Sequence, residues 1–124
     1  MQYLMLIYNQ ESTYMKMTPQ EQAAMSAEFG KYTEEITKAG KYRGGNRLAP
    51  IVSATTVRVR DGKRVATDGP FAETKEQLGG YYLIDANDLD EAILLAAKIP
   101  SARLGSVEVR PIVEMGARAD SAKG

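Results

Sequence analysis

The chain has 124 residues, 44% of them hydrophobic and 26% charged, which is the length and composition of one globular domain. Lys plus Arg and Asp plus Glu number 16 each, so the chain lacks the basic excess of a nucleic-acid-binding protein. Cysteine and histidine are both absent, which excludes disulfides, thiolate nucleophiles, serine triads, haem held by a proximal histidine and ordinary zinc sites. We therefore expect no metal and no cofactor. Acid–base chemistry would depend on Asp, Glu, Lys or Tyr.

The first third of the chain predicts a strand and a long helix. Residues 2–8 (QYLMLIY) are apolar on both faces, which is typical of a strand covered on both sides. Residues 9–17 are polar and predict a loop. Residues 18–21 (TPQE) form a capping box with proline at the first helical position. The apolar stripe that follows predicts a helix ending at Gly40. No basic and apolar leader precedes the first strand and no run is long enough to cross a bilayer, so we expect a cytoplasmic protein without a membrane partner.

The middle of the chain predicts three strands, two of them joined as a hairpin. Residues 41–50 form a weak strand that two glycines interrupt. Residues 55–60 (TTVRVR) alternate, and we expect Val57 and Val59 to point inward. The Asp-Gly pair that follows is a strong signal for a two-residue turn, so residues 63–67 return as the partner strand.

A second strand and helix follow the hairpin. Residues 80–85 (GYYLID) form another strand that is apolar on both faces. Asp88 begins a helix that Pro100 stops. The residues predicted to face the core on this helix are Leu89, Ala92, Ile93, Ala96 and Ile99.

The C-terminal part of the chain predicts one more strand and a tail. The last strand covers residues 107–115, and Pro111 within it requires an edge or a bulge because proline donates no hydrogen bond to a ladder. Residues 116–124 are small and polar, so we expect a flexible tail. One domain would then extend over residues 1–115.

The order of these elements predicts an α+β fold. With the hairpin as an insertion, it is the βαββαβ plan of the ferredoxin-like arrangement, with an antiparallel sheet. Two helices cover only one face of such a sheet, yet two of its strands are apolar on both faces. No segment of the chain is left over to cover the second face. A second copy of the sheet would cover it, so we predict a face-to-face homodimer.

Residues 68–86 (DGPFAETKEQLGGYYLIDA) resemble the signature of the DGPF group within the YCII-related family, and the likeness extends to MQYLMLIY, TTVRVRDG, DLDEAILLAAKIP and VEVRPIVEM. It implies a YCII-related, DGPF-like domain that forms a dimeric α/β barrel. Some YCII-like relatives carry a His–Asp pair associated with catalysis, but this chain has no histidine. Other members of the family are associated with extracytoplasmic-function sigma factors.

The signature contains the charged candidate residues. Asp68 begins a turn that ends at Phe71, because Asp, Gly and Pro each favour turn geometry. In a second interpretation, compatible with the first, Asp68 also faces a ligand. Glu73 and Lys75 in the next six residues form either a solvated loop or a carboxylate and an ammonium that bind a small polar ligand. A desolvated Glu73 could act as a general base.

Further candidates lie on the strands. Tyr81 and Tyr82 point to opposite faces, so we expect one in the core and the other between sheets. The preceding glycine pair (79–80) favours a β-bulge over close ligand approach. Arg110 lies opposite the valines of the last strand, which favours cross-strand pairing or a dimer contact over substrate binding. Residues 44–47 (GGNR) match no phosphate loop, so anion binding there is the less favoured interpretation.

Three functions follow from these residues and from the resemblance. The favoured hypothesis is a small-molecule-binding or accessory, regulatory protein. The first alternative is a cofactor-independent isomerase, lyase or oxygenase with Asp68 and Glu73 as catalytic groups. The second is an interaction partner of a sigma factor, which the resemblance alone implies. The candidate ligand-binding residues are Phe71, Lys75, Tyr81 and Arg110.

Overall fold

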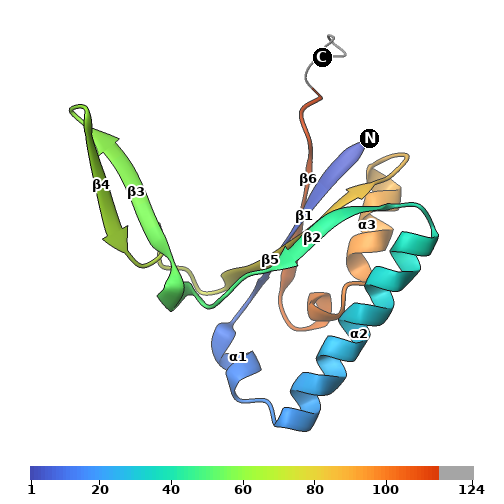
Figure 1. The fold of residues 1–124 in the computed structure, drawn as a ribbon. Coiled ribbons are helices and arrows are strands. Elements are labelled where there is room, and N and C mark those ends of the chain that lie inside the picture. The colour runs from blue at the N-terminus through green and yellow to red at the C-terminus, as the bar shows by residue number, and fades with distance from the viewer. Residues whose placement is uncertain (115–124) are drawn as a thin grey trace.

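A four-stranded antiparallel sheet lies at the centre of the computed structural model, which describes residues 1–114 (Figure 1). The elements are β1 (Gln2–Asn9), α1 (Glu11–Met15), α2 (Pro19–Lys38), β2 (Tyr42–Arg47), η1 (Ile51–Ser53), β3 (Thr55–Arg60), β4 (Lys63–Asp68), β5 (Gln77–Asp85), α3 (Leu89–Ala97), η2 (Pro100–Arg103) and β6 (Ser106–Pro111). The strand order β2-β5-β1-β6, with a separate β3-β4 hairpin, is the ferredoxin-like α+β arrangement with an insertion. The predicted tail, 116–124, lies outside the described residues.

Local signals in the sequence set the ends of α2. The Thr18 side chain accepts a hydrogen bond from the Glu21 backbone N–H at 3.1 Å, and the Glu21 carboxylate accepts one from the Thr18 N–H at 2.8 Å. This reciprocal pair satisfies two donors that the first turn leaves free. Gly40, just beyond the helix, has a φ of 75°, a conformation that glycine adopts without cost. The predicted helix is therefore confirmed.

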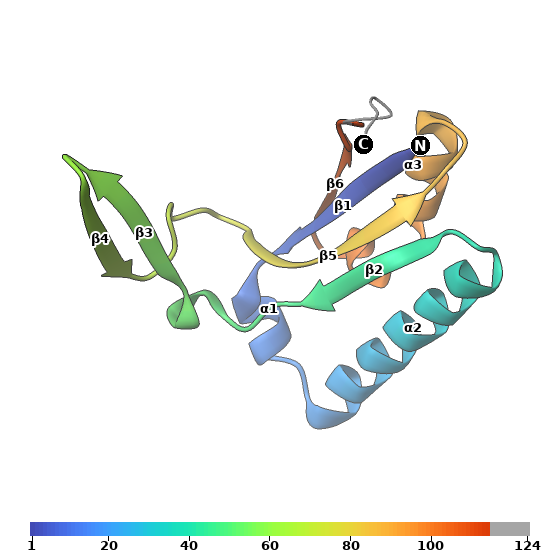
Figure 2. The ribbon, with the colours of Figure 1, turned by 45° about the horizontal axis from the view of Figure 1, so that its top comes forward.

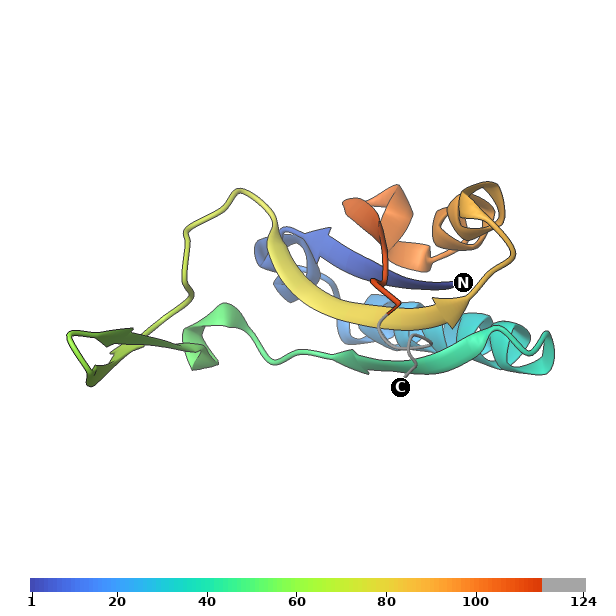
Figure 3. The same cartoon turned by 90° about the horizontal axis from the view of Figure 1, so that it is seen from above.

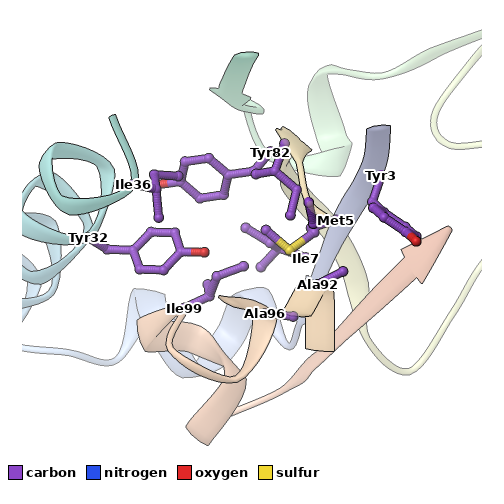
Figure 4. Close-up of a cluster of buried hydrophobic side chains, with 11 residues drawn as sticks. Tyr3, Met5, Ile7, Tyr32, Ile36, Tyr82, Ala92, Ala96 and Ile99 are labelled. Carbon is purple, nitrogen blue, oxygen red and sulfur yellow. The ribbon is translucent and has the colours of Figure 1, made fainter. Parts of the chain in front are cut away.

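One face of the sheet packs against α2 and α3 (Figure 4). Its side chains alternate along β1 and β5, so every second residue is buried. The core consists of Tyr3, Met5, Ile7, Tyr32, Ile36, Tyr82, Ile84, Ala86, Ala92, Ala96 and Ile99. This core fixes the helices over the strands, which decides where a cavity can form between them.

The opposite face of the sheet carries apolar side chains that are only half-buried. Leu4 pairs with Leu83, and Leu6 pairs with Tyr81, across β1 and β5. In Figure 3, α2 lies behind the strands β2 and β5, on the side of the sheet that carries the core. Within residues 1–114 no helix or strand covers this open face.

The β3-β4 hairpin projects away from the sheet and helices as an arm (Figures 1 and 2). Its turn is the predicted one, with Asp61 and Gly62 at φ values of 54° and 74°. Val57 and Val59 are 57% and 63% exposed, so the prediction that they point inward is wrong. The alternating pattern correctly predicted that Val57 and Val59 share one face of the hairpin. Among the described residues, however, nothing packs onto that face.

Two further predictions need correction. Residues 9–17 are not only loop, because they contain α1, which tertiary hydrogen bonds hold in place. The Glu11 N–H donates to Gln77 Oε1 at 3.0 Å, and Glu11 Oε2 accepts from the Ile51 N–H at 2.9 Å. In the stripe predicted for the second helix, Leu89 and Ile93 are half-exposed, whereas Ala92, Ala96 and Ile99 are buried in the core.

The predicted bulge and the predicted edge position of Pro111 are both confirmed. Ile7 pairs with Gly80 and Tyr8 with Leu78, so Gly79 is the extra residue of a bulge. Pro111 ends β6, which is an edge strand. No helix within the described part of the chain is long and apolar enough to span a membrane.

Candidate functional site

A cavity of about 390 Å³ lies where α1, the middle of α2 and η2 meet the ends of β1, β2 and β5. This volume is in the range of sites that hold small organic molecules. Much of its wall is apolar and comes from flexible or aromatic side chains. These are Ile7, Met15, Met17, Met25, Phe29, Leu48, Tyr82 and Leu104. Methionine side chains adapt their shape to a ligand, so this wall can accept different apolar groups.

The side chains that line the cavity differ in exposure, and we call the part lined by the buried ones its inner end and the part lined by the exposed ones its mouth. Tyr82, Ile7 and Ser101 are buried, whereas Met15 is 73% exposed. The inner end is therefore screened from water, and hydrogen bonds made there are stronger than at the surface.

Two hydroxyl groups at the inner end are hydrogen-bonded to each other. The oxygens of Thr33 and Tyr82 lie 2.7 Å apart, and the Thr33 hydroxyl donates to the Phe29 carbonyl at 2.9 Å. Burial raises the pKa of Tyr82 above its ordinary value, and the nearby Tyr42 phenol adds to this, although the Thr33 hydrogen bond opposes it. Tyr82 is thus a neutral phenol at pH 7.

Charged groups lie toward the mouth. The Arg47 guanidinium lies 4.6 Å from the centre of the Tyr14 ring, in cation–π geometry. The Gln22 side-chain amide donates to the Tyr14 carbonyl at 3.0 Å and so ties α1 to α2. Glu11 also lines the cavity, with one carboxylate oxygen held by the Ile51 N–H. Arg47 and Glu11 can orient a polar group of a ligand as it enters.

Gly45 keeps β2 close to β5 beside the cavity. A Cβ atom at this position would lie 2.8 Å from the Tyr81 carbonyl oxygen and 3.0 Å from Tyr82 Cδ1. Only glycine fits such an approach. The glycine therefore lets the Tyr82 ring stand against the strand.

The predicted catalytic residues do not line this cavity. Asp68 is exposed at the end of β4, paired with Thr55, and Glu73 and Lys75 are exposed in the loop before β5. The structure therefore places these three charged side chains on the surface between the arm and the sheet. Asp68 and Glu73 stay predictions as catalytic groups.

The predicted ligand-binding residues are in three places. Tyr81 borders the 390 Å³ cavity as part of β5, but its side chain lies with Leu6 on the open face, and its hydroxyl accepts a hydrogen bond from the Asn46 side chain at 2.9 Å. Phe71, which is 76% exposed, lines a wider cleft of about 510 Å³ at the base of the arm. The Arg58 guanidinium lies 5.2 Å from the Phe71 ring centre. Arg110 lies opposite Leu4 on the edge strand, on the open face.

The sequence analysis did not identify Thr33, Ser101 or Tyr14 as site residues. For Thr33 one signal was available, because it is a hydroxyl residue four positions after Phe29, beside the apolar stripe of α2.

Among residues 1–114 no group of three or more Asp and Glu side chains is arranged to hold a metal ion. The polar groups of the cavity are hydroxyls, amides, one guanidinium and one carboxylate. Such a set recognises a ligand by hydrogen bonding and by shape.

Comparison with known proteins identifies the family of the chain and a solved structure with the same fold. The sequence profile of the YCII-related domain matches residues 1–116. An uncharacterised protein of Rhizobium meliloti (strain 1021) is 40% identical over 114 residues, which cover 90% of this chain and 92% of that protein. The solved structure of 5-chloro-2-hydroxyhydroquinone dehydrochlorinase from Burkholderia phenoliruptrix AC1100, in complex with 2,5-dihydroxybenzoquinone, superposes with a TM-score of 0.57. That alignment covers 97% of this chain and 100% of the other at 15% identity, so it shows the shared fold alone.

Proposed function

Because this chain belongs to the YCII-related family and has a cavity of about 390 Å³ between its helices and its sheet, we propose that it binds a small organic molecule there. The cavity is the observation that carries the proposal. Its wall is largely apolar, with a few polar groups placed among the apolar ones, which is the usual composition of a ligand site. The ligand is therefore a compact, mainly apolar molecule with one or two polar groups.

The fold comparison supports a flat ring as the apolar part. The dehydrochlorinase with the same fold is complexed with 2,5-dihydroxybenzoquinone, so this architecture accommodates a flat, oxygenated ring. Phe29 and Tyr82 provide aromatic surface in the cavity of the present chain. Aromatic rings pack favourably on such surfaces.

A thermal-shift screen with small aromatic compounds tests the proposal. We expect some of them to raise the melting temperature of the wild-type protein, because a ligand that binds only the folded state stabilises it. Met25→Trp puts a larger ring into the cavity and should abolish the shift. Glu73→Gln, in the exposed loop, is the matched control and should leave the shift unchanged. The proposal is wrong if no compound stabilises the protein, or if the shift survives Met25→Trp and disappears in Glu73→Gln.

We further propose that the protein is a homodimer in which two open faces meet. Leu4, Leu6 and Leu83 are half-buried on that face, and covering them with a second copy would remove apolar surface from water. Glu108 and Arg110 lie on the same face, next to Leu6 and Leu4. In a two-fold symmetric contact each surface meets its own copy, so opposite charges on one face can pair across it.

The match to the family profile over nearly the whole chain also supports a single domain over residues 1–115.

The enzyme alternative requires a second location. Asp68 and Glu73 line neither the 390 Å³ cavity nor the cleft at the base of the arm, so they would have to act on a molecule that extends out of that cleft, beside Phe71. Loss of turnover in Asp68→Asn and Glu73→Gln, with unchanged stability, would support that reading. Membership of the DGPF group and partnership with a sigma factor stay predictions from the resemblance.

A further inference from the structure

The inner end of the cavity contains a buried hydroxyl that has no partner. Ser101 is 3% exposed, and its Oγ makes no hydrogen bond with any residue that the structure describes. Buried polar atoms are nearly always paired, because an unpaired one loses its hydrogen bonds to water without replacement. Ser101 lines the cavity, so a molecule inside the cavity is in a position to supply the missing partner.

The fold does not need this hydroxyl. Ser101 stabilises η2 through its backbone, since its carbonyl accepts from the N–H groups of Leu104 at 3.0 Å and Gly105 at 2.9 Å. Alanine would provide the same carbonyl. The side-chain oxygen is therefore available for recognition.

The neighbouring groups indicate an uncharged ligand atom. The one hydrogen of the Thr33 hydroxyl goes to the Phe29 carbonyl, so Tyr82 must donate to Thr33, and the Tyr82 oxygen keeps a free lone pair. The charged side chains of the cavity lining are Arg47 and Glu11, neither of them buried. A carboxylate at the inner end would lose its hydration without meeting a cation.

We propose that the bound molecule places an uncharged hydroxyl or carbonyl oxygen against Ser101 Oγ, with its apolar ring on Met25 and Phe29. The ligand class is then a phenol, alcohol or ketone on an apolar ring. An apolar carboxylate or a plain hydrocarbon fits less well. This inference rests on the proposed function, because it names the chemistry recognised at the same cavity.

Equilibrium dialysis with three matched probes tests the inference. Para-propylphenol, propylbenzene and para-propylbenzoate share one apolar part and differ in one polar group. We expect the wild-type protein to bind the phenol about fivefold to tenfold more tightly than the hydrocarbon, which is the usual effect of one hydrogen bond. Ser101→Ala should remove most of this preference by weakening phenol binding alone. Ser12→Ala makes the same chemical change in an exposed residue outside the cavity lining and should leave both affinities unchanged.

The melting temperature of ligand-free Ser101→Ala is the second readout. It should equal or exceed that of the wild type, because no hydrogen bond is lost. Equal binding of phenol and hydrocarbon, tightest binding of the benzoate, or an unchanged preference in Ser101→Ala would each overturn the inference and leave the cavity as a binding site. Binding of none of the three probes would contradict the proposed function as well.

Discussion

Tyr81 and Tyr82 are neighbours in β5, but their environments differ. Tyr82 is buried under α2, with its ring in edge-to-face contact with Tyr32 at 5.3 Å and Tyr42 at 6.2 Å. Tyr81 is half-buried on the open face, and its hydroxyl accepts from Asn46. The same residue type therefore contributes to a core and a cavity on one side, and to an uncovered surface on the other.

The difference explains why the strand is apolar on both faces. A side chain is buried only by a second layer, and α2 and α3 provide that layer on one face. The open face has the same apolar character without a covering layer among the described residues. One face of the sheet packs in the core and borders the cavity, and the other is the face proposed to meet a second copy of the chain.

The largest expected effect comes from the buried tyrosine. Tyr82→Ala leaves a cavity in the core and removes the partner of Thr33, so the free energy of unfolding should fall by about 3–5 kcal/mol. Tyr81→Ala should lower the free energy of unfolding by about 1 kcal/mol or less when the protein is dilute enough to be monomeric. Urea unfolding at low protein concentration measures both. Equal losses would contradict the assignment of the two faces.

The next effect concerns assembly. A side chain at Gly44 would meet no atom of the same chain within 4 Å, and Gly44 pairs with Leu83 on the open face. Gly44→Phe should therefore leave the monomer folded and weaken the dimer by about tenfold to 100-fold, because the added ring separates the two faces. Sedimentation velocity over a range of concentrations measures this change.

Gly30→Phe is the matched control for that experiment. Gly30 lies on the exposed side of α2 and also has open space around it. The dimer should persist in this variant. Dissociation in both variants, or in neither, would argue against a contact through the open face.

The smallest expected effect is on stability in acid. The N-terminal ammonium lies 3.2 Å from Asp85 and, with Arg43 at 3.0 Å, holds the pKa of that carboxyl below its usual range. The Asn87 N–H and Lys41 lower the pKa of Glu91 in the same way. Carboxyls with lowered pKa values stabilise the folded state above their unfolded pKa, near pH 4, and this stabilisation is lost as the pH falls further.

Urea midpoints between about pH 7 and pH 3 measure this acid dependence. An Asp85→Asn and Glu91→Gln double variant should lose less stability on acidification than the wild type. Both carboxyls are partly exposed, so the difference should be small and should shrink in salt. Identical acid sensitivity of the two proteins would show that the contacts do not stabilise the fold.

Elements with a local chemical signal were predictable from the sequence. The Thr18 and Glu21 capping box, the Asp61-Gly62 turn and the bulge at Gly79 each depend on residues close together in the chain. The short helix α1 depends instead on hydrogen bonds between Glu11 and both Gln77 and Ile51, which are distant in sequence. Such contacts leave no periodic pattern in five residues.

The candidate site was harder to predict for a related reason. Charged residues such as Asp68 and Glu73 attract attention in a sequence without cysteine and histidine, but the structure places them on the surface. In the sequence Ser101 is one of six serines with nothing to distinguish it, and only the fold shows that it is buried without a partner. Whether a hydroxyl is paired depends on three-dimensional packing, which composition and spacing do not specify.

Hydrogen–deuterium exchange with and without saturating para-propylphenol tests the central claim most directly, namely that the ligand binds between the helices and the sheet. We predict slower exchange in residues 25–33 and 100–104, which border the cavity, and unchanged exchange in the signature loop, residues 69–76. Protection confined to residues 69–76 would contradict the account and would place the site at the base of the arm.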